Sequence, residues 1–328
     1  MLNNINEVIN QFTHGVNIIS DVFAGTGVVS RFFKENGYTV FSNDNLYFSY
    51  VLNKGILEIN RPVTQVMREI INHLNNLSVE NCSWFNIESA FIYQNYSPHD
   101  QCKRMYFQND NALKIDLVRQ EIERIKEDIT ESEYYYLLAL LLNAVPFVSN
   151  ITGTYGAYLK YWDKRTYKPL VLEEIEVINN NIQCKCYNLD ALNFTRQVSS
   201  DLIYLDPPYN GRQYMPNYHI LESIAKYDSP EIKGITGVRV DPEKMSDYCK
   251  KNKAEAAFRE LLGELDCRYI LLSYNNEGIL NTETMSAVLR DSGNPQTFRL
   301  FEYEYRRYKN KIPNNTEGLK EQLYLIEK

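Results

Sequence analysis

Apolar and small residues near the start of the chain follow a strand, turn, helix, strand order. The predicted elements are a buried strand over Val16–Val22, a glycine turn over 23–27 (FAGTG), a helix over Val28–Asn36 that Gly37 ends, and a strand over Tyr38–Ser42 closed by Asn43 and Asp44. This order is typical of the first half of a nucleotide-binding α/β unit.

The middle of the chain, roughly Ile59 to Leu172, has a helical pattern instead. Apolar residues recur at alternating spacings of three and four, which predicts an amphipathic helix through Ile115, Val118, Ile122, Ile125 and Ile129. A coiled-coil partner is an alternative interpretation, but the repeat lasts barely three heptads, so packing within the same domain fits better.

A second helix is predicted directly after this one. Thr130 and Glu133 have the spacing of a capping box, and the apolar pattern continues to Ala144, before Pro146 interrupts it. We therefore expect a helical insertion in an otherwise α/β chain.

From about Asn181 the strand pattern returns. The predicted strands lie in IQCKCY before Asp190, in DLIYL before Asp206, in CRYILLSYNNEG (Cys267 to Gly278), in TFRLFEYEYRRY and in EQLYLIE. The last two have no helix between them, which indicates an antiparallel hairpin at the edge of a mostly parallel sheet. The expected fold is Rossmann-like α/β, with a catalytic domain over residues 1–58 and 181–328 and a helical insertion over 59–180.

Composition and charge narrow the class of protein. A chain of 328 residues with ordinary apolar and charged fractions can bury a large core, and it contains no apolar run long enough to span a bilayer. Six scattered cysteines without a nearby histidine set predict reduced thiols and no metal site, so we expect a cytoplasmic protein. The net charge of −7 argues against indiscriminate nucleic-acid binding but not against a local basic surface.

The glycine turn is the first candidate binding element. Gly25 and Gly27 allow a ligand to approach the backbone at a helix N-terminus, and Asp44 lies where a ribose hydroxyl could donate to it. The remaining glycines of a dinucleotide fingerprint and a phosphate-binding lysine are missing, so a ligand without phosphates fits better than NAD or ATP. Asp190 fits either a ligand contact at the same sheet edge or a solvated turn.

The stretch Asp206-Pro207-Pro208-Tyr209 is the more specific signal. An amine conjugated to a purine ring is a poor nucleophile, because its lone pair is delocalised. Two acceptors on its hydrogens, the Asp206 carboxylate and the Pro207 carbonyl, would draw the nitrogen toward a tetrahedral geometry. The prolines fix the backbone, and Tyr209 offers an aromatic face for stacking.

These segments together resemble a known family. DVFAGTG (Asp21 to Gly27), Asp44, the YNLDAL turn and DPPY resemble, in this order, the S-adenosylmethionine-dependent DNA adenine-N6 methyltransferases of the Dam-like D12 class. NGRQYMPNYHILESIA (Asn210 to Ala225), LLSYNNEG (Leu271 to Gly278) and NITGTYGAYLKYW (Asn150 to Trp162) are similar to the FokI-type modification methylases. The resemblance runs from about Ile18 onward and implies a class I methyltransferase fold.

The resemblance also implies roles for individual residues. It implies donor-binding positions at Asp21, Phe23, Ala24, Gly25, Gly27, Asn43, Asp44 and Asp190, and catalytic positions at Asp206, Pro207, Pro208 and Tyr209. Relatives usually carry an aromatic-x-Gly-x-Lys segment before the glycine turn, which MLNNINEVINQF lacks. We expect either that the start is truncated or that another element closes the donor site.

Two clusters of cations and aromatic rings are candidate DNA contacts. Lys160, Lys164, Arg165 and Lys168 interleave with aromatic residues in the predicted insertion, and Arg306, Arg307 and Lys309 lie in the last hairpin. Arg212 and Tyr214 follow the DPPY turn closely. A solvated face with packed aromatics is the alternative for each cluster.

The sequence therefore predicts an enzyme that transfers a methyl group from S-adenosylmethionine to adenine N6 in double-stranded DNA by direct in-line displacement, leaving S-adenosylhomocysteine. A restriction-modification system is the expected setting, without metal or membrane; the sequence leaves open whether a cognate endonuclease is a partner. Methylation of cytosine N4 or of RNA adenine, and a non-catalytic DNA-binding relative, are the alternatives.

Overall fold

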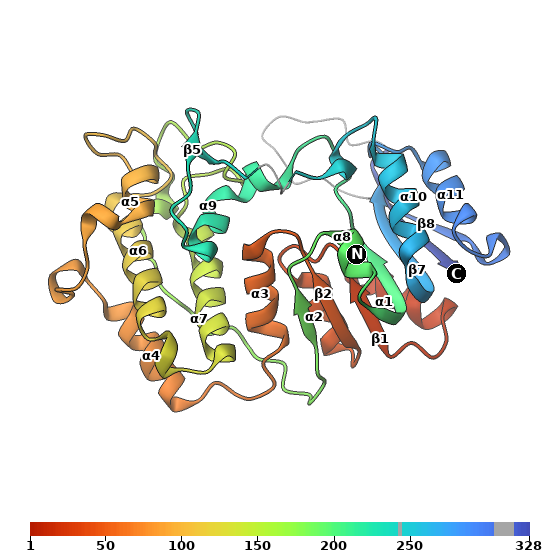
Figure 1. The fold of residues 1–328 in the computed structure, drawn as a ribbon, viewed down its shortest axis with the longest axis horizontal. Coiled ribbons are helices and arrows are strands. Elements are labelled where there is room, and N and C mark those ends of the chain that lie inside the picture. Colours follow the sequence, from red (N-terminus) through yellow and green to blue (C-terminus); the bar gives the residue numbers. More distant parts are fainter. Residues whose placement is uncertain (242–244, 305–317) are drawn as a thin grey trace. The chain divides into compact units, whose positions relative to one another are not determined.

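The computed structural model describes residues 1–241, 245–304 and 318–328. The chain divides into two compact units, each built from separate segments (Figure 1). The α/β unit comprises Met1–Asn45, Ile182–Gln213 and Ser246–Lys328, and the helical unit comprises Leu46–Asn181 and Tyr214–Met245. Among the described residues, no helix combines the length and apolar character that crossing a membrane requires.

The α/β unit is built on a seven-stranded sheet with the order β3-β2-β1-β4-β7-β9-β8. Its strands are β1 (Ile18–Asp21), β2 (Thr39–Asn43), β3 (Lys185–Tyr187), β4 (Ser199–Leu205), β7 (Asp266–Asn275), β8 (Arg299–Glu304) and β9 (Lys320–Glu327). The pairs among the first five strands of the sheet are parallel, and β9 is antiparallel to both β7 and β8. The predicted parallel sheet with a C-terminal antiparallel hairpin is confirmed.

Helices cover both faces of this sheet. They are α1 (Leu2–Phe12), α2 (Val28–Glu35), α8 (Ala191–Thr195), α10 (Ala254–Glu264) and α11 (Thr282–Asp291). On one face Phe33 of α2 packs edge-on against Tyr204 of β4, with ring centroids 5.7 Å apart. On the other face α8, α10 and α11 bury apolar side chains against Ile203 and Leu272, and α10 and α11 lie side by side (Figure 1). Burial on both faces explains the apolar runs in the sequence.

The helical unit contains α3 (Tyr47–Leu57), α4 (Gln65–Asn76), α5 (Phe91–Tyr96), α6 (Asn109–Arg124), α7 (Glu131–Ala144), α9 (Tyr214–Lys226) and the hairpin of β5 (Ile232–Lys233) and β6 (Val238–Arg239). The predicted capping box is present, since Thr130 and Glu133 satisfy each other's backbone N–H groups. The preceding helix, α6, ends at Arg124, whereas its apolar pattern predicted that it would continue through Ile129. Ile125 and Ile129 nevertheless pack on the core.

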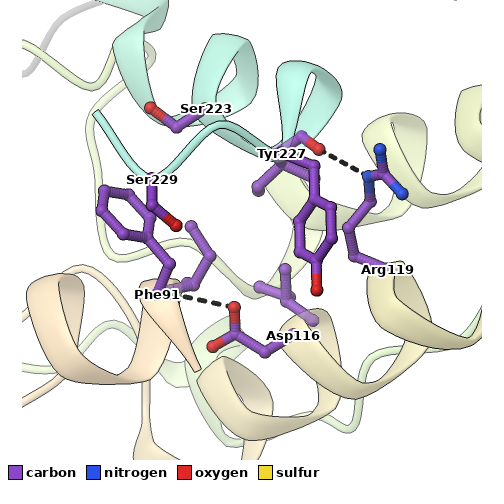
Figure 2. Close-up of a pocket in the computed structure, with 9 residues that line it drawn as sticks. Phe91, Asp116, Arg119, Ser223, Tyr227 and Ser229 are labelled. Atoms are coloured by element: carbon purple, nitrogen blue, oxygen red, sulfur yellow. Dashed lines mark hydrogen bonds between the residues drawn. The ribbon is translucent and has the colours of Figure 1, made fainter. Parts of the chain in front are cut away.

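Two buried polar side chains of α6, Asp116 and Arg119, connect this helix to α5 and α9 (Figure 2). The Asp116 carboxylate accepts the backbone N–H groups of Ile92 and Tyr93, at 3.0 and 2.8 Å, and Arg119 donates to the Ile224 carbonyl at 2.9 Å. Burial raises the pKa of Asp116 to about 7. The cavity between these groups measures about 10 Å³, which corresponds to a single water rather than a ligand.

Candidate active site

The carboxyl ends of β1, β2 and β4 bring the predicted catalytic and ligand-binding residues to one edge of the sheet. Asp21 ends β1, and Asp206 directly follows β4, its neighbour in the sheet. Chain order reverses here, because β1 lies between β2 and β4, and such a switch point is where open α/β sheets bind ligands.

The glycine turn between β1 and α2 has a backbone that only glycine adopts readily. Gly25 and Gly27 have φ angles of 55° and 81°, both in the left-handed region. α2 begins immediately afterwards, without a side-chain cap and without an acidic residue in its first turn. The N-terminus of this helix is therefore available for backbone contacts with a ligand.

Asp44 closes this turn from the end of β2. Its Oδ2 accepts the Gly25 N–H at 2.9 Å, and its carbonyl accepts from the Asn188 side chain at 2.8 Å. The carboxylate is thus fixed beside the glycine turn, where it can also accept hydrogen bonds from a ligand.

Asn43 is fully occupied by the protein backbone. Its Nδ2 donates to the Val22 and Leu189 carbonyls, both at 3.1 Å, and its Oδ1 accepts the Leu189 N–H at 3.0 Å. The side chain is only 2% exposed. Asn43 therefore holds the ends of β1, β2 and β3 in register, and its side chain has little left for a ligand.

Asp21 is a buried carboxylate with one unsatisfied oxygen. Its Oδ2 accepts from the Ser30 hydroxyl at 2.6 Å, whereas Oδ1 has no hydrogen-bond partner among the described residues. Burial raises the pKa of Asp21 to about 7; Ser30 and, less strongly, the backbone of Phe23 oppose this effect, and the nearby Asp206 and Asp44 add to it. An orphaned buried acceptor at this edge suits a cationic ligand group.

Asp206 differs from Asp21 because its side chain is exposed to solvent. Desolvation by the surrounding protein, followed by the charge of Glu321, raises its pKa to about 7, and the water that reaches it screens part of this effect. Pro207 is buried, while Tyr209 keeps 39% of its surface exposed. The Tyr209 carbonyl accepts the Ile279 N–H at 2.9 Å, which ties this turn to the loop after β7.

Asp190 and Phe23 both lie near Tyr248, an aromatic residue that the sequence analysis did not predict as part of the site. Asp190 caps α8 by accepting the Asn193 N–H at 3.1 Å. Tyr248, in the short helix Asp247–Cys249, packs edge-on against Phe23 with ring centroids 5.2 Å apart, and its pKa is raised by burial and then by Asp190. Tyr248 lies 225 positions beyond Phe23 in the sequence, so no local pattern could have indicated it.

The predicted DNA-binding cations lie in different parts of the structure. Lys160, Lys164 and Lys168 are exposed in the helical unit, and Tyr161 and Tyr167 beside them are each 67% exposed. Arg165 instead turns inward to donate to the Ile151 carbonyl. In the α/β unit Arg212 is exposed, and in the helical unit Tyr214 is 38% exposed. Arg306, Arg307 and Lys309 lie outside the described residues.

The α/β unit therefore brings together the glycine turn, Asp21, Asp44 and Asp206, while the basic residues 160–168 belong to the helical unit. Within the described ranges, no group of three His, Cys, Asp or Glu side chains is placed to hold a metal ion. The arrangement combines a buried acceptor, an open helix N-terminus and an accessible carboxylate.

Comparison with known proteins gives the family. The family of D12 class N6 adenine-specific DNA methyltransferases matches residues 1–288. The chain is 43% identical to the type II methyltransferase M.FokI of Planomicrobium okeanokoites over all of its own length and 51% of the relative, and 38% identical to the modification methylase StsI of Streptococcus sanguinis over all of its length and 50% of the relative.

A third relative has nearly the same length as this chain. The type II methyltransferase M.NlaIII of Neisseria lactamica is 38% identical over 95% of this chain and 91% of the relative, whereas the chain spans about half the length of the first two. The mostly parallel sheet with its C-terminal antiparallel pair agrees with the class I methyltransferase fold. This chain belongs to the D12 class of N6 adenine-specific DNA methyltransferases.

Proposed function

We propose that this chain methylates the N6 amine of a target adenine in duplex DNA, as the modification enzyme of a restriction-modification system. The observation that carries the proposal is the accessible Asp206 carboxylate, which follows β4 beside the glycine turn and Asp21 at the end of β1. The family match and the relatives named as modification methylases support it.

The donor would bind at the glycine turn. S-adenosylmethionine, which the family implies, supplies a methyl group on a sulfonium sulfur. We assign the orphaned Oδ1 of Asp21 and the N-terminus of α2 to the amino acid part, since these groups pair with an ammonium and a carboxylate respectively. Asp44 would accept from the ribose, and Asp190, Phe23 and Tyr248 would border the adenine of the donor.

The acceptor amine would bind at the DPPY turn. Asp206 and the Pro207 carbonyl would each accept a hydrogen bond from one of the two N–H groups of adenine N6, so that the nitrogen lone pair turns toward the methyl carbon. Tyr209, with its partly exposed ring on a turn fixed through Ile279, would stack on the base after it leaves the duplex. Orientation and these acceptors would supply most of the acceleration.

The helical unit would hold the DNA. Lys160, Lys164 and Lys168 are exposed and flanked by exposed tyrosines, a combination suited to phosphate contacts and stacking. Ile235, at the tip of the β5–β6 hairpin, is 85% exposed although Arg104 fixes the tip by donating to the Gly234 and Ile235 carbonyls. A rigid apolar tip of this kind fits a groove or a base step in duplex DNA.

The reaction is tested with labelled S-adenosylmethionine and unmethylated duplex DNA, using Asp206→Ala as the control. We expect label in the DNA with the wild-type chain and at least about a 100-fold slower transfer with the variant, whose donor affinity should stay nearly unchanged. Donor binding without any transfer to duplex DNA would contradict the proposal and leave RNA or another exocyclic amine as the acceptor.

The DNA surface is tested by replacing Lys160, Lys164 and Lys168 with alanine together. The dependence of log affinity on log salt should become less steep by up to about 3, because each lost phosphate contact removes nearly one unit of slope. Arg61, Arg68 and Lys126 form the matched control triple, since each is about half exposed and paired with a glutamate of the same unit. An equal effect of both triples would exclude a specific role for residues 160–168.

A further inference from the structure

A row of polar side chains crosses one face of the sheet at its carboxyl edge. Asp21 is opposite Tyr204 in the β1–β4 register, and Tyr204 is opposite Leu271 in β4–β7. Side chains two positions apart along a strand lie on the same face of the sheet. Asp206 is therefore on the same face as Tyr204, and Ser273 and Asn275 are on the same face as Leu271. Glu321 of β9 is opposite Asn275 and belongs to the same row.

One hydrogen bond to its carboxylate and one beside it hold Glu321 where β9 pairs with the end of β7. The Asn275 side chain donates to its carboxylate at 3.3 Å, and next to this pair the Lys320 N–H donates to the Asn276 side chain at 2.9 Å. The side chain of Glu321 is partly buried, and burial raises its pKa. Among the described residues, no cationic side chain pairs with this carboxylate, and the α-amino group of Met1 opposes only part of the rise in its pKa. Burying a carboxylate in this way is costly to maintain for structure alone.

We propose that Glu321 is a positioning residue that strengthens Asp206 as the acceptor of the proton released from the adenine amine. This inference rests on the proposed function. Neither the sequence motifs nor the predicted site included Glu321, because it lies 115 positions beyond Asp206.

The charges around Asp206 support this assignment. Glu321 is the charge that adds to desolvation in raising the pKa of Asp206, and both carboxylates also raise the pKa of the buried Tyr204 on β4. Asp21 approaches from β1, with Asp44 beyond it. The positive α-amino group of Met1 lies near Glu321 and, like the Asn275 hydrogen bond, opposes the rise in the pKa of Glu321 without cancelling it. Like charges close together make each carboxylate hold a proton more strongly.

A stronger base at Asp206 has a definite use in the reaction. As the bond from N6 to the methyl carbon forms, the bond from carbon to sulfur breaks and its electron pair stays on sulfur. The nitrogen then carries one proton too many. Asp206 accepts this proton and, being exposed, passes it to solvent. Glu321 favours the transfer by raising the proton affinity of Asp206.

The test is the pH dependence of the transfer rate in Glu321→Gln. Glutamine keeps an oxygen for the Asn275 hydrogen bond and removes only the charge. We expect the acidic limb of the rate profile to move to lower pH by about half a pH unit or more, with a lower rate on the alkaline plateau. Glu302→Gln on β8 is the matched control, since Glu302 pairs with Lys320 and Gln322 instead, and its profile should keep the wild-type limb.

A direct titration separates this inference from the proposed function. In the donor-free protein, carbon-13 NMR of the Asp206 carboxyl, assigned with Asp206→Asn, should show a lower pKa in Glu321→Gln than in the wild type. Coincident titration curves would overturn the inference even if methylation is observed. A lower Asp206 pKa in Glu321→Gln, combined with a wild-type chain that transfers no methyl group, would instead support the coupling of the two carboxylates and reject the proposed reaction.

Discussion

Carboxylates of this chain have different chemistry because of their surroundings, although three of them share a raised pKa of about 7. Asp116 is sealed within the helical unit and binds backbone N–H groups, whereas Asp206 is exposed at a sheet edge. Asp21 is buried with one oxygen orphaned. Position in the fold decides which carboxylate stabilises the protein and which can act on a substrate.

Tyr209→Ala should lower kcat/KM for duplex DNA by about 10- to 100-fold, because stacking of a base on an aromatic ring contributes about 1–3 kcal/mol. The backbone contact with Ile279 does not involve the ring, so donor affinity should be unchanged. Tyr209→Phe keeps the ring and should remain within about threefold of the wild type in steady-state assays. A loss of the same size in both variants would rule out stacking as the main role.

The raised pKa of Asp116 leads us to expect that the free energy of unfolding depends on pH. Its pKa is raised from 3.8 to about 7 in the folded state, so the folded protein binds more protons than the unfolded chain between these values. The contribution of Asp116 to the free energy of unfolding therefore falls as pH rises from about 4 to about 7, and is constant above that range.

The substitution Asp116→Asn removes this dependence and tests it. Urea unfolding at several pH values should give a difference in free energy between wild type and variant that shrinks or reverses as pH rises from 5 to about 7.5. A difference that stays constant across this range would show that Asp116 titrates normally in the folded protein.

At the residue scale, sequence reasoning located the groups whose neighbours are local in the chain. Gly25, Asp44 and Asp206 end strands or open turns, and the structure brings them to one edge as expected. Other features depend on partners that are distant in the sequence. These are the hydrogen bonds of Asn43 to Val22 and Leu189, the inward orientation of Arg165, and the packing of Tyr248 on Phe23. No spacing in the sequence encodes these contacts.

At the scale of helices, α7 is capped by residues close to it in the sequence, whereas α3 is capped by a residue far from it. The capping box of α7 uses residues three apart, and the sequence predicted it correctly. α3 begins without a cap of its own, and Glu222 of α9 accepts its Tyr47 and Phe48 N–H groups at 3.1 and 2.9 Å. These groups are more than 170 positions from Glu222, so the cap could not be predicted.

Glu222→Ala should therefore destabilise the protein by roughly 2–4 kcal/mol, because Glu222 is fully buried and its loss leaves the Tyr47 and Phe48 N–H groups without this acceptor and removes an ion pair with Lys226. Urea unfolding measures the loss. Glu231→Ala is the control, since Glu231 is exposed and forms its one ion pair among the described residues with the exposed Lys233, and the substitution should cost less than about 0.5 kcal/mol. Equal losses would contradict the capping role.

At the scale of the whole molecule, the α/β pattern and the helical insertion were both readable from apolar periodicity. The helical unit of the structure begins at Leu46 and also takes in Tyr214–Met245, which the sequence analysis had grouped with the catalytic domain. α9 follows the DPPY turn in the chain but packs with α3 and α7. We propose that the two units divide the work, with methyl transfer in the α/β unit and DNA recognition in the helical unit.

The chemical identity of the product tests this account most directly. Unmethylated duplex DNA is incubated with the chain and S-adenosylmethionine, digested to nucleosides and separated by chromatography with mass detection. The account predicts N6-methyldeoxyadenosine as the methylated nucleoside, and its loss with Asp206→Ala. Methylation at cytosine N4, or a chain that binds the donor and DNA yet yields no methylated nucleoside, would contradict it.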